Sequence, residues 1–150
     1  MYDLIVCGTG FASSFFLKRW LERRPGSQVL VLERGWADDY GTMIGERRNS
    51  SVNSMELFEQ RGLTNKQWLF TIGMGGGSNC WWGQTPRMLP EDFELRSRFN
   101  VGFDWPISYS DLEQYYETAE DLIAVSGPDS APYRRRKPCP QPPHPPSGFD

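Results

Sequence analysis

Two closely spaced glycines near the start of the chain, Gly8 and Gly10, could bring the backbone close to a phosphate group. They directly follow an apolar run, Leu4-Ile5-Val6-Cys7, and precede a segment with helical periodicity. Gly8 permits a tight turn, Gly10 lets backbone N–H groups approach a pyrophosphate, and the positive end of the following helix would face that anion. Ser13 stands where this pattern usually has a third glycine, so the helix must pack on the strand with a small hydroxyl side chain between them.

A carboxylate, Glu33, ends a second apolar run and completes the pattern. A carboxylate in this place can accept hydrogen bonds from the ribose hydroxyls of a dinucleotide, although Glu33 lies somewhat beyond the usual spacing of ~20 residues. An ordinary strand-to-helix turn would also contain Gly8 and Gly10. The order of strand, glycine turn, helix, strand and acid over 2–35 nevertheless favours a dinucleotide site.

The helix that must position this turn has one apolar face and a marked end. Lys18, Glu22 and other polar residues lie opposite that face, and Pro25-Gly26 stops the helix after two arginines that suit the negative end of its dipole. The predicted packing face consists of Ser13, Phe16, Leu17, Trp20 and Leu21.

A second glycine-rich stretch occupies 73–83 and reads GMGGGSNCWWG. Its glycines can adopt positive φ angles and expose consecutive backbone N–H groups, and Ser78 adds a hydroxyl donor. A flexible linker is the alternative interpretation, but linkers rich in glycine lack flanking bulky residues such as Trp81 and Trp82. The stretch is therefore predicted to approach a second part of a large ligand.

The remaining elements are predicted from local pattern. Short segments are expected at Ser54 to Arg61 (helix) and Gln67 to Ile72 (strand), within an otherwise irregular region from Trp36 to Gln67. A longer helix should begin at Ser108, where Asp111 completes a capping box, and end at Gly127-Pro128. Its apolar stripe is expected to pack into a core and consists of Leu112, Tyr115, Tyr116, Ala119, Leu122 and Ile123.

Composition excludes several classes of function. The net charge of -3, from 16 basic and 19 acidic residues, shows no basic face for nucleic acid or an anionic membrane. Three cysteines, with Cys7 expected in a buried strand, and a single histidine argue against a disulfide framework and a metal site. With neither a signal peptide nor an apolar run of membrane-spanning length, we expect a cytoplasmic protein; its oligomeric state is left open.

The C-terminal stretch from Pro128 to Asp150 holds 8 of the 12 prolines and should be extended. Its basic cluster, Arg134-Arg135-Arg136-Lys137, is interpreted as a solvated linker patch, and His144 as a solvated linker residue.

Taken together, the two glycine-rich loops and the segment DWPISYSDLEQYYETAEDLIAVSG resemble the N-terminal FAD-binding portion of the glucose-methanol-choline (GMC) oxidoreductases. Within that family, GGGSNCWWGQTPRMLPEDF is most similar to the branch of pyranose oxidases and sugar dehydrogenases. The resemblance implies an α/β, Rossmann-like FAD/NAD(P)-binding fold, incomplete at the C-terminus. It implies an FAD-binding part over 1–127 and a proline-rich linker over 128–150 toward a missing substrate domain.

The family removes two electrons from an alcohol, usually a sugar or sterol hydroxyl, as a hydride to flavin. Carried over by resemblance, the first turn would hold the FAD pyrophosphate, Glu33 the adenosine ribose, and the second loop the pyrophosphate side and the flavin, with 79–82 along the isoalloxazine ring. The implied cofactor-binding residues are Gly8, Gly10, Phe11, Ala12, Ser13, Glu33, Arg34, Gly75, Gly76, Gly77, Ser78, Asn79, Cys80, Trp81 and Trp82.

Two positions depart from the family. Members with covalently attached flavin have a histidine where this chain has Cys80, which excludes a histidyl link and favours non-covalent FAD over a cysteinyl link. Many relatives also have Asn before Gly where this chain has Trp81 and Trp82.

The family's proton acceptor is a histidine near the C-terminus of a much longer chain. This chain has only His144, so no catalytic residue is assigned. The leading expectation is part of an FAD-dependent enzyme that oxidises a small alcohol or sugar, with the 150 residues alone inactive. The alternatives are a non-catalytic nucleotide-binding module and an NAD-dependent dehydrogenase domain.

Overall fold

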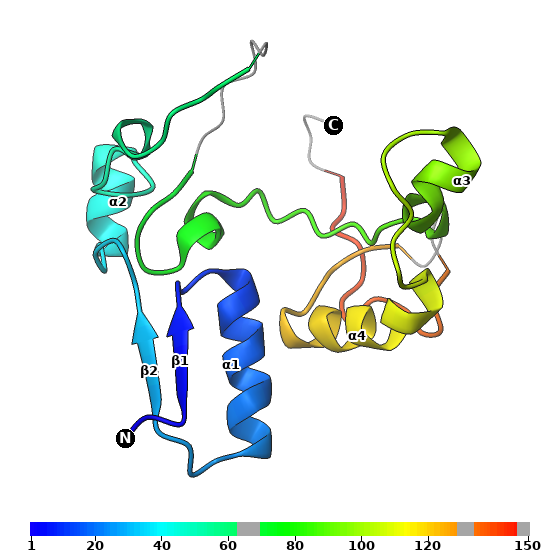
Figure 1. Ribbon diagram of the computed structural model, residues 1–150, viewed down its shortest axis with the longest axis horizontal. Helices are drawn as coiled ribbons and strands as arrows, with labels where there is room; N and C mark the ends of the chain where they lie inside the picture. The colour runs from blue at the N-terminus through cyan, green and yellow to red at the C-terminus, as the bar shows by residue number, and fades with distance from the viewer. Residues whose placement is uncertain (63–69, 129–133, 147–150) are drawn as a thin grey trace. The chain divides into compact units, whose positions relative to one another are not determined.

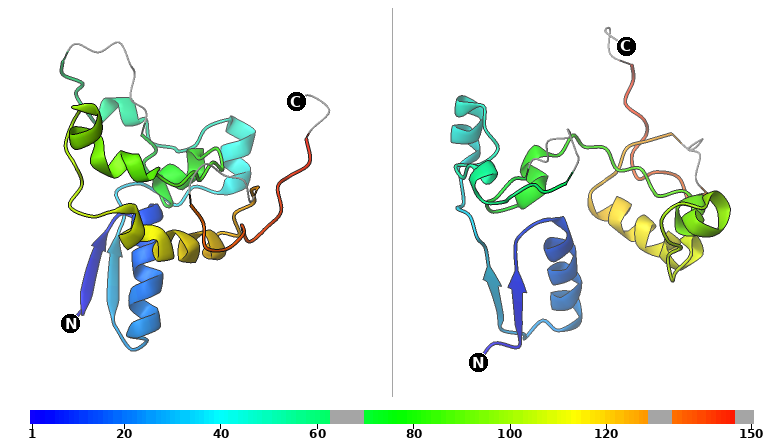
Figure 2. Two further views of the ribbon diagram at one scale, coloured as in Figure 1. Left: turned by 90° about the vertical axis from the view of Figure 1, so that its right-hand side faces the viewer. Right: turned by 45° about the horizontal axis from the view of Figure 1, so that its top comes forward.

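The apolar run at the N-terminus forms the first strand of a parallel pair. In the computed structural model, which describes residues 1–62, 70–128 and 134–146, β1 (Leu4–Cys7) pairs with β2 (Val29–Leu32), so that Leu4 lies opposite Val29 and Cys7 opposite Leu32. Helix α1 (Phe11–Arg23) connects the two strands and lies alongside them (Figures 1 and 2). This unit confirms the predicted order of strand, turn, helix and strand and agrees with the α/β class. The Rossmann-like assignment stays a prediction.

The chain divides into two compact units, Met1–Gly83 and Gln84–Asp150, which are described separately. The predicted FAD-binding part over 1–127 and linker over 128–150 concern function rather than compactness, so this division stays a prediction. None of the helices in the described ranges has the length and apolar character needed to traverse a lipid bilayer.

The strands of the first unit are only partly covered. Leu4 and Val6 are half-buried, whereas Ile5 and Cys7 are exposed, as expected for a strand with one covered face. The prediction that Cys7 is buried is therefore wrong, because it assumed a sheet covered on both faces. The same partial cover leaves Phe16 of α1 half exposed although it belongs to the predicted packing face.

The connection between β2 and the second glycine stretch contains a helix that the sequence pattern did not predict. Helix α2 (Tyr40–Glu46) begins after Asp39, whose carboxylate accepts a hydrogen bond from the Thr42 N–H at 2.8 Å. The helix expected over 54–61 is reduced to a 3-10 turn, η1 (Ser54–Glu56). Of the strand expected over 67–72, residues 67–69 lie outside the described residues and 70–72 are not in a strand.

The second unit contains η3 (Pro90–Glu94), α3 (Leu95–Phe99) and α4 (Tyr109–Leu122). The predicted capping box is confirmed, because the Asp111 carboxylate accepts hydrogen bonds from the Ser108 N–H at 2.8 Å and the Ser108 hydroxyl at 2.7 Å. The predicted end at Gly127 is wrong. Helix α4 stops earlier because Ala124 takes a left-handed conformation (φ 52°) and the Val125 N–H closes the turn on the Glu120 carbonyl at 3.0 Å.

The buried face of α4 is ionic rather than apolar. Tyr109, Glu113 and Glu120 are its buried residues, whereas Tyr115 of the predicted apolar stripe is 62% exposed. The prediction that this stripe packs into a core is therefore wrong for Tyr115, Leu122 and Ile123, whereas the other three members, Leu112, Tyr116 and Ala119, are half-buried. The small apolar core of the unit forms instead around Phe93, whose ring meets those of Trp105 and Tyr109 edge to face.

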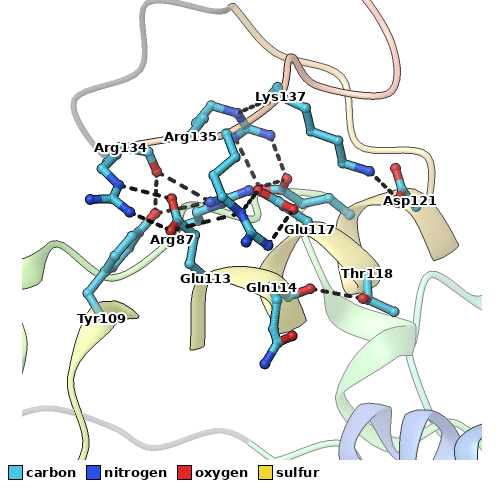
Figure 3. Close-up of polar contacts among 12 residues, drawn as sticks. Arg87, Tyr109, Glu113, Gln114, Glu117, Thr118, Asp121, Arg134, Arg135 and Lys137 are labelled. Carbon is cyan, nitrogen blue, oxygen red and sulfur yellow. Dashed lines mark hydrogen bonds and ion pairs between the residues drawn. The ribbon is translucent and has the colours of Figure 1, made fainter. Parts of the chain in front are cut away.

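Four consecutive basic residues account for the ionic face of α4 (Figure 3). The ion pairs are Arg134 with Glu113, Arg135 with Glu120, Arg136 with Glu117 and Lys137 with Asp121. The interpretation of this cluster as a solvated linker patch is wrong for Arg135, whose side chain is only 6% exposed, whereas the other three side chains are exposed but also form ion pairs. The described tail residues 134–146 form no helix or named strand, in line with the extended conformation expected, and His144 is exposed as predicted.

Arg87 completes the cluster from another segment of the same unit. Its side chain is 1% exposed and contacts both carboxylate oxygens of Glu120 at 2.7 Å. Burial alone would raise the pKa of Glu120, but hydrogen bonds from Arg87 and Arg135 outweigh this effect and hold that pKa below its ordinary value. Glu120 therefore stays ionised between two guanidinium groups.

Candidate nucleotide-binding site

The first glycine turn has the geometry that the spacing predicts. Gly8 takes a φ of +90°, and its N–H donates to the Leu32 carbonyl at 2.7 Å, which ties the turn to the end of β2. Gly10 precedes the first turn of α1 in an extended conformation. A methyl group built on Gly8 would lie 4.0 Å from the Ser13 hydroxyl, so the serine fits beside the turn at ordinary contact distance. The replacement of the third glycine is thus accommodated.

The second glycine stretch forms a compact 3-10 turn, η2 (Gly76–Cys80). Gly75 and Gly76 have φ angles of +94° and +52°, which confirms the expectation that these glycines adopt positive φ. The Ser78 hydroxyl donates to the Gly75 carbonyl and the Asn79 amide to the Met74 carbonyl, both at 2.9 Å. These side chains therefore stabilise the turn in the structure, and the flexible-linker alternative does not describe it.

The two glycine regions meet at the N-terminus of α1, although they are far apart in the sequence. A methyl group on Gly76 would lie 3.6 Å from the Gly10 Cα, and the Phe11 and Trp81 rings contact edge to face with centroids 5.0 Å apart. The Gly75 N–H donates to the Thr9 hydroxyl at 2.9 Å across 66 positions of sequence. The green turn beside the blue N-terminal end of α1 in Figures 1 and 2 shows this meeting.

A second pair of glycines, Gly35 and Gly73, brings the segment after β2 into close contact with the start of the second loop. A methyl group on Gly35, two residues after Glu33, would lie 2.6 Å from both the Cα and the N of Gly73. The backbones can approach so closely only because neither residue has a side chain. The Met74 N–H also donates to the Trp36 carbonyl at 2.9 Å, so the segment after β2 is paired with the start of the second loop.

Glu33 is held by hydrogen bonds from the chain itself. Its Oε2 accepts from the Thr9 N–H at 3.0 Å and the Thr9 hydroxyl at 2.5 Å, and its Oε1 accepts from the Arg34 N–H at 2.7 Å and the Gly35 N–H at 3.1 Å. The Thr9 hydroxyl, followed by the Gly35 N–H, lowers the pKa of Glu33. The carboxylate is therefore ionised at neutral pH and lies at the glycine turn where the sequence predicts it.

The predicted residues differ in how closely they gather. The second loop contacts Gly10 and Phe11. The first turn contains Gly8, with Ser13 beside it, and the Thr9 hydroxyl connects this turn to Glu33. Ala12, Arg34, Gly77 and Ser78 are exposed. Cys80 is exposed as well, and its thiol donates weakly to the Gly77 carbonyl at 3.5 Å. Trp82 is 93% exposed, so its ring has little cover in this unit.

Three residues of the arrangement were missed by the sequence interpretation: Thr9, Gly35 and Gly73. The sequence does mark each of these positions. Thr9 carries a hydroxyl between two glycines, Gly35 is two residues after Glu33, and Gly73 begins the second glycine stretch. Local pattern could not show that Gly35 and Gly73 pack against each other, since that contact joins distant segments.

A cavity of about 570 Å³ lies beside the second glycine loop and is lined in part by Cys80 and Trp82. Its volume falls within the range of ~300–1,000 Å³ typical of small-molecule sites. Further lining residues are Asn49, Ser50, Asn53 and Thr71. The cavity therefore offers amide and hydroxyl groups next to an aromatic ring.

A second cavity, of about 660 Å³, belongs to the other unit and is lined by Phe93, Trp105 and the three carboxylates of Glu94, Asp104 and Asp111. Asp104 accepts hydrogen bonds from the N–H groups of Arg96 and Ser97, and Asp111 caps α4. These two carboxylates serve helix ends, and Glu94 pairs with Arg98 at 2.5 Å, so the cavity is a weaker candidate for a ligand site than the glycine loops.

The chain is similar to proteins that are named as oxidising enzymes. It is 40% identical over 153 residues to the fructose dehydrogenase large subunit of Gluconobacter japonicus, which covers 85% of this chain and 28% of that protein. It is 28% identical over 134 residues to the 6'''-hydroxyparomomycin C oxidase of Streptomyces lividus, covering 87% of this chain and 24% of the relative. It is 26% identical over 158 residues to the gluconate 2-dehydrogenase flavoprotein of Pantoea cypripedii, covering 83% and 25%.

The chain spans about a quarter of the length of these curated relatives. No protein-family model matches it. The relatives are dehydrogenases or oxidases, and one of them is named a flavoprotein, so the chain is related to oxidoreductases. Membership of the GMC family stays a prediction from the resemblance.

Proposed function

We propose that the chain binds FAD without a covalent link and forms the nucleotide-binding part of a GMC-type oxidoreductase that oxidises an alcohol, such as a sugar or polyol. The observation that carries the proposal is the meeting of two glycine loops at the N-terminus of α1, where a methyl group on Gly76 would lie 3.6 Å from Gly10. The names of the relatives, a fructose dehydrogenase and a gluconate 2-dehydrogenase flavoprotein among them, support the class of reaction and of substrate.

The residues present fit such a nucleotide. Gly8, Gly10 and the N-terminus of the 13-residue α1 would hold the pyrophosphate, because backbone N–H groups and the helix dipole both favour an anion there. Glu33 would bind the adenosine ribose by exchanging its hydrogen bonds from Arg34 and Gly35 for those of the ribose hydroxyls, and the loop at 75–82 would hold the flavin side. Flavin, when bound, supplies the acceptor for a hydride leaving an alcohol carbon.

The chain's own contribution is binding and orientation. An alcohol that loses a hydride must also lose its hydroxyl proton, which requires a base within hydrogen-bond reach. His144 is exposed in the proline-rich tail, so we do not assign it this role. We expect the 150 residues by themselves to bind the nucleotide without turning over an alcohol.

The variant Gly10→Ala tests the nucleotide site without disturbing the fold. A methyl group there would meet only the Gly75 carbonyl oxygen, at an ordinary 4.0 Å, but it would occupy the space through which the backbone approaches a pyrophosphate. The matched control is Gly26→Ala, since a methyl group on Gly26 meets no atom within 4 Å.

The assay is a titration of each protein with FAD, and separately with NAD, followed by flavin fluorescence or calorimetry. We expect saturable FAD binding by the wild-type chain and by Gly26→Ala, and at least about tenfold weaker binding by Gly10→Ala, equivalent to about 1.4 kcal/mol. Tight binding of NAD instead of FAD would favour the NAD-dependent alternative. Failure of the wild-type chain to bind FAD would contradict the proposal.

A further inference from the structure

The Thr9 hydroxyl joins three segments through two hydrogen bonds. It accepts from the Gly75 N–H at 2.9 Å and donates to Glu33 Oε2 at 2.5 Å. The direction of both bonds is fixed, because a backbone N–H can only donate and an ionised carboxylate can only accept. The sequence of bonds therefore runs from the second glycine loop, through Thr9, to the acid at the end of β2.

Glu33, at the end of this sequence of bonds, is itself held in place by several hydrogen bonds. Glu33 accepts hydrogen bonds from two groups of Thr9 and from the N–H groups of Arg34 and Gly35, which matches the approximately four acceptor positions of a carboxylate. Hydrogen bonds to an ionised group are shorter and stronger than those between neutral groups. A polarised chain of bonds also strengthens each member.

The other contacts between the two loops have less directional character. Gly10 and Gly76 approach through backbone atoms, with no side chains to interlock, and the Phe11 and Trp81 rings contact edge to face. A hydrogen bond at 2.9 Å to the Gly75 N–H fixes the register of one loop relative to the other.

We propose that Thr9 is a positioning residue, which sets the second glycine loop relative to the first so that one nucleotide can be held at both of its ends. This role rests on the proposed FAD site. A ligand that uses only the first turn and Glu33, such as ADP, does not need the second loop to be in place. A ligand that reaches both loops, such as FAD, loses affinity when the register is lost.

The test compares Thr9→Val, which keeps the shape of the side chain but has no hydroxyl, with Thr9→Ser, which keeps the hydroxyl. We expect Thr9→Val to bind FAD about tenfold more weakly than the wild type, in keeping with the loss of a charge-assisted hydrogen bond, and to bind ADP within about threefold of the wild type. Thr9→Ser should restore FAD binding to within about threefold. Equal losses for FAD and ADP in Thr9→Val, or no loss for either, would overturn the role, and so would failure of Thr9→Ser to restore binding.

Amide hydrogen exchange without any nucleotide separates this proposal from the proposed function. Thr9→Val should speed exchange in a peptide covering 73–77 and leave a peptide covering α2 (Tyr40–Glu46) unchanged, which also shows that the variant is folded. If the wild-type chain binds neither FAD nor ADP, the FAD proposal fails, and this exchange comparison alone decides the positioning role. Unchanged exchange at 73–77 overturns it.

Discussion

The contact between Gly35 and Gly73 predicts a large effect for a single added methyl group. In Gly35→Ala the new Cβ would lie 2.6 Å from the Gly73 Cα and N and 2.8 Å from the Ile72 carbonyl carbon. These are backbone atoms, so no side chain can rotate away to make room. The variant therefore has to separate the segment after β2 from the start of the second glycine loop.

The size of the effect follows from these distances. Restoring the lower limit of ordinary contact, 3.4 Å, from 2.6 Å requires a separation of about 0.8 Å (3.4 − 2.6). Overpacking of this kind costs about 1–3 kcal/mol. The same movement stretches the hydrogen bond from the Met74 N–H to the Trp36 carbonyl, now 2.9 Å, which contributes about 0.5–1.5 kcal/mol. We expect a loss of about 3 kcal/mol in the free energy of unfolding, a large part of the ~5–15 kcal/mol typical of a domain.

Urea denaturation, followed by tryptophan fluorescence and circular dichroism, measures this loss. The matched control is Gly45→Ala within α2, where a methyl group meets no atom within 4 Å. Because alanine favours a helix over glycine, the control should gain about 0.5–1 kcal/mol. FAD affinity should fall in Gly35→Ala and stay unchanged in Gly45→Ala. A Gly35→Ala protein as stable as the wild type, to within about 0.5 kcal/mol, would refute the packing argument.

Two further predictions concern the carboxylates of Glu120 and Glu33. Arg87→Met removes one of two guanidinium groups from Glu120, whereas Glu120→Gln removes the carboxylate that both Arg87 and Arg135 contact. In urea denaturation we expect the free energy of unfolding to fall by about 3 kcal/mol for Arg87→Met and by more for Glu120→Gln. An equal or smaller loss for Glu120→Gln would contradict the assignment of Glu120 as the centre of the cluster. Because the pKa of Glu33 is lower in the folded chain than its ordinary value of 4.5, its stabilising contribution is complete above about pH 4.5 and is lost as pH falls through the folded pKa. Stability measured against pH should therefore fall less steeply on the acid side in Glu33→Gln than in the wild type, and identical acid limbs would contradict this.

The parts of the structure that sequence pattern predicted are those governed by neighbours in the chain. The turn at Gly8 and Gly10 needs a positive φ and small residues, and glycine supplies both wherever it is placed. Pro25 ends α1 because proline has no N–H to donate and disfavours a helical conformation in the residue before it, Arg24. The capping box of Ser108 and Asp111 joins residues three apart, so it too could be predicted from spacing.

The parts that sequence pattern predicted wrongly depend on contacts between distant segments. The apolar stripe of α4 suggested a buried face, but the four basic residues at 134–137 pair with acids on another face of that helix. Nothing in the sequence around Glu120 marks it as buried, and the approach of Arg87, 33 positions earlier, and of Arg135, 15 positions later, makes it a buried charge. Periodicity carries no information about such partners.

The candidate site shows the same division. Both glycine loops were predicted from composition, and their meeting at the N-terminus of α1 could be expected only from the resemblance to a family. The bond between Thr9 and Gly75 spans 66 positions, and no local rule indicates it. The ribose-binding role of Glu33 stays a prediction, because in the structure its oxygens accept hydrogen bonds from Thr9, Arg34 and Gly35.

Hydrogen exchange in the presence of nucleotides tests most directly whether both glycine loops hold one ligand. Peptides covering 8–13 and 73–78 would be followed in the free chain, with saturating ADP and with saturating FAD. We expect ADP to slow exchange mainly at 8–13 and FAD to slow exchange at both segments, with α2 as an internal reference. Slower exchange at 8–13 alone with FAD, or at neither segment, would contradict the account.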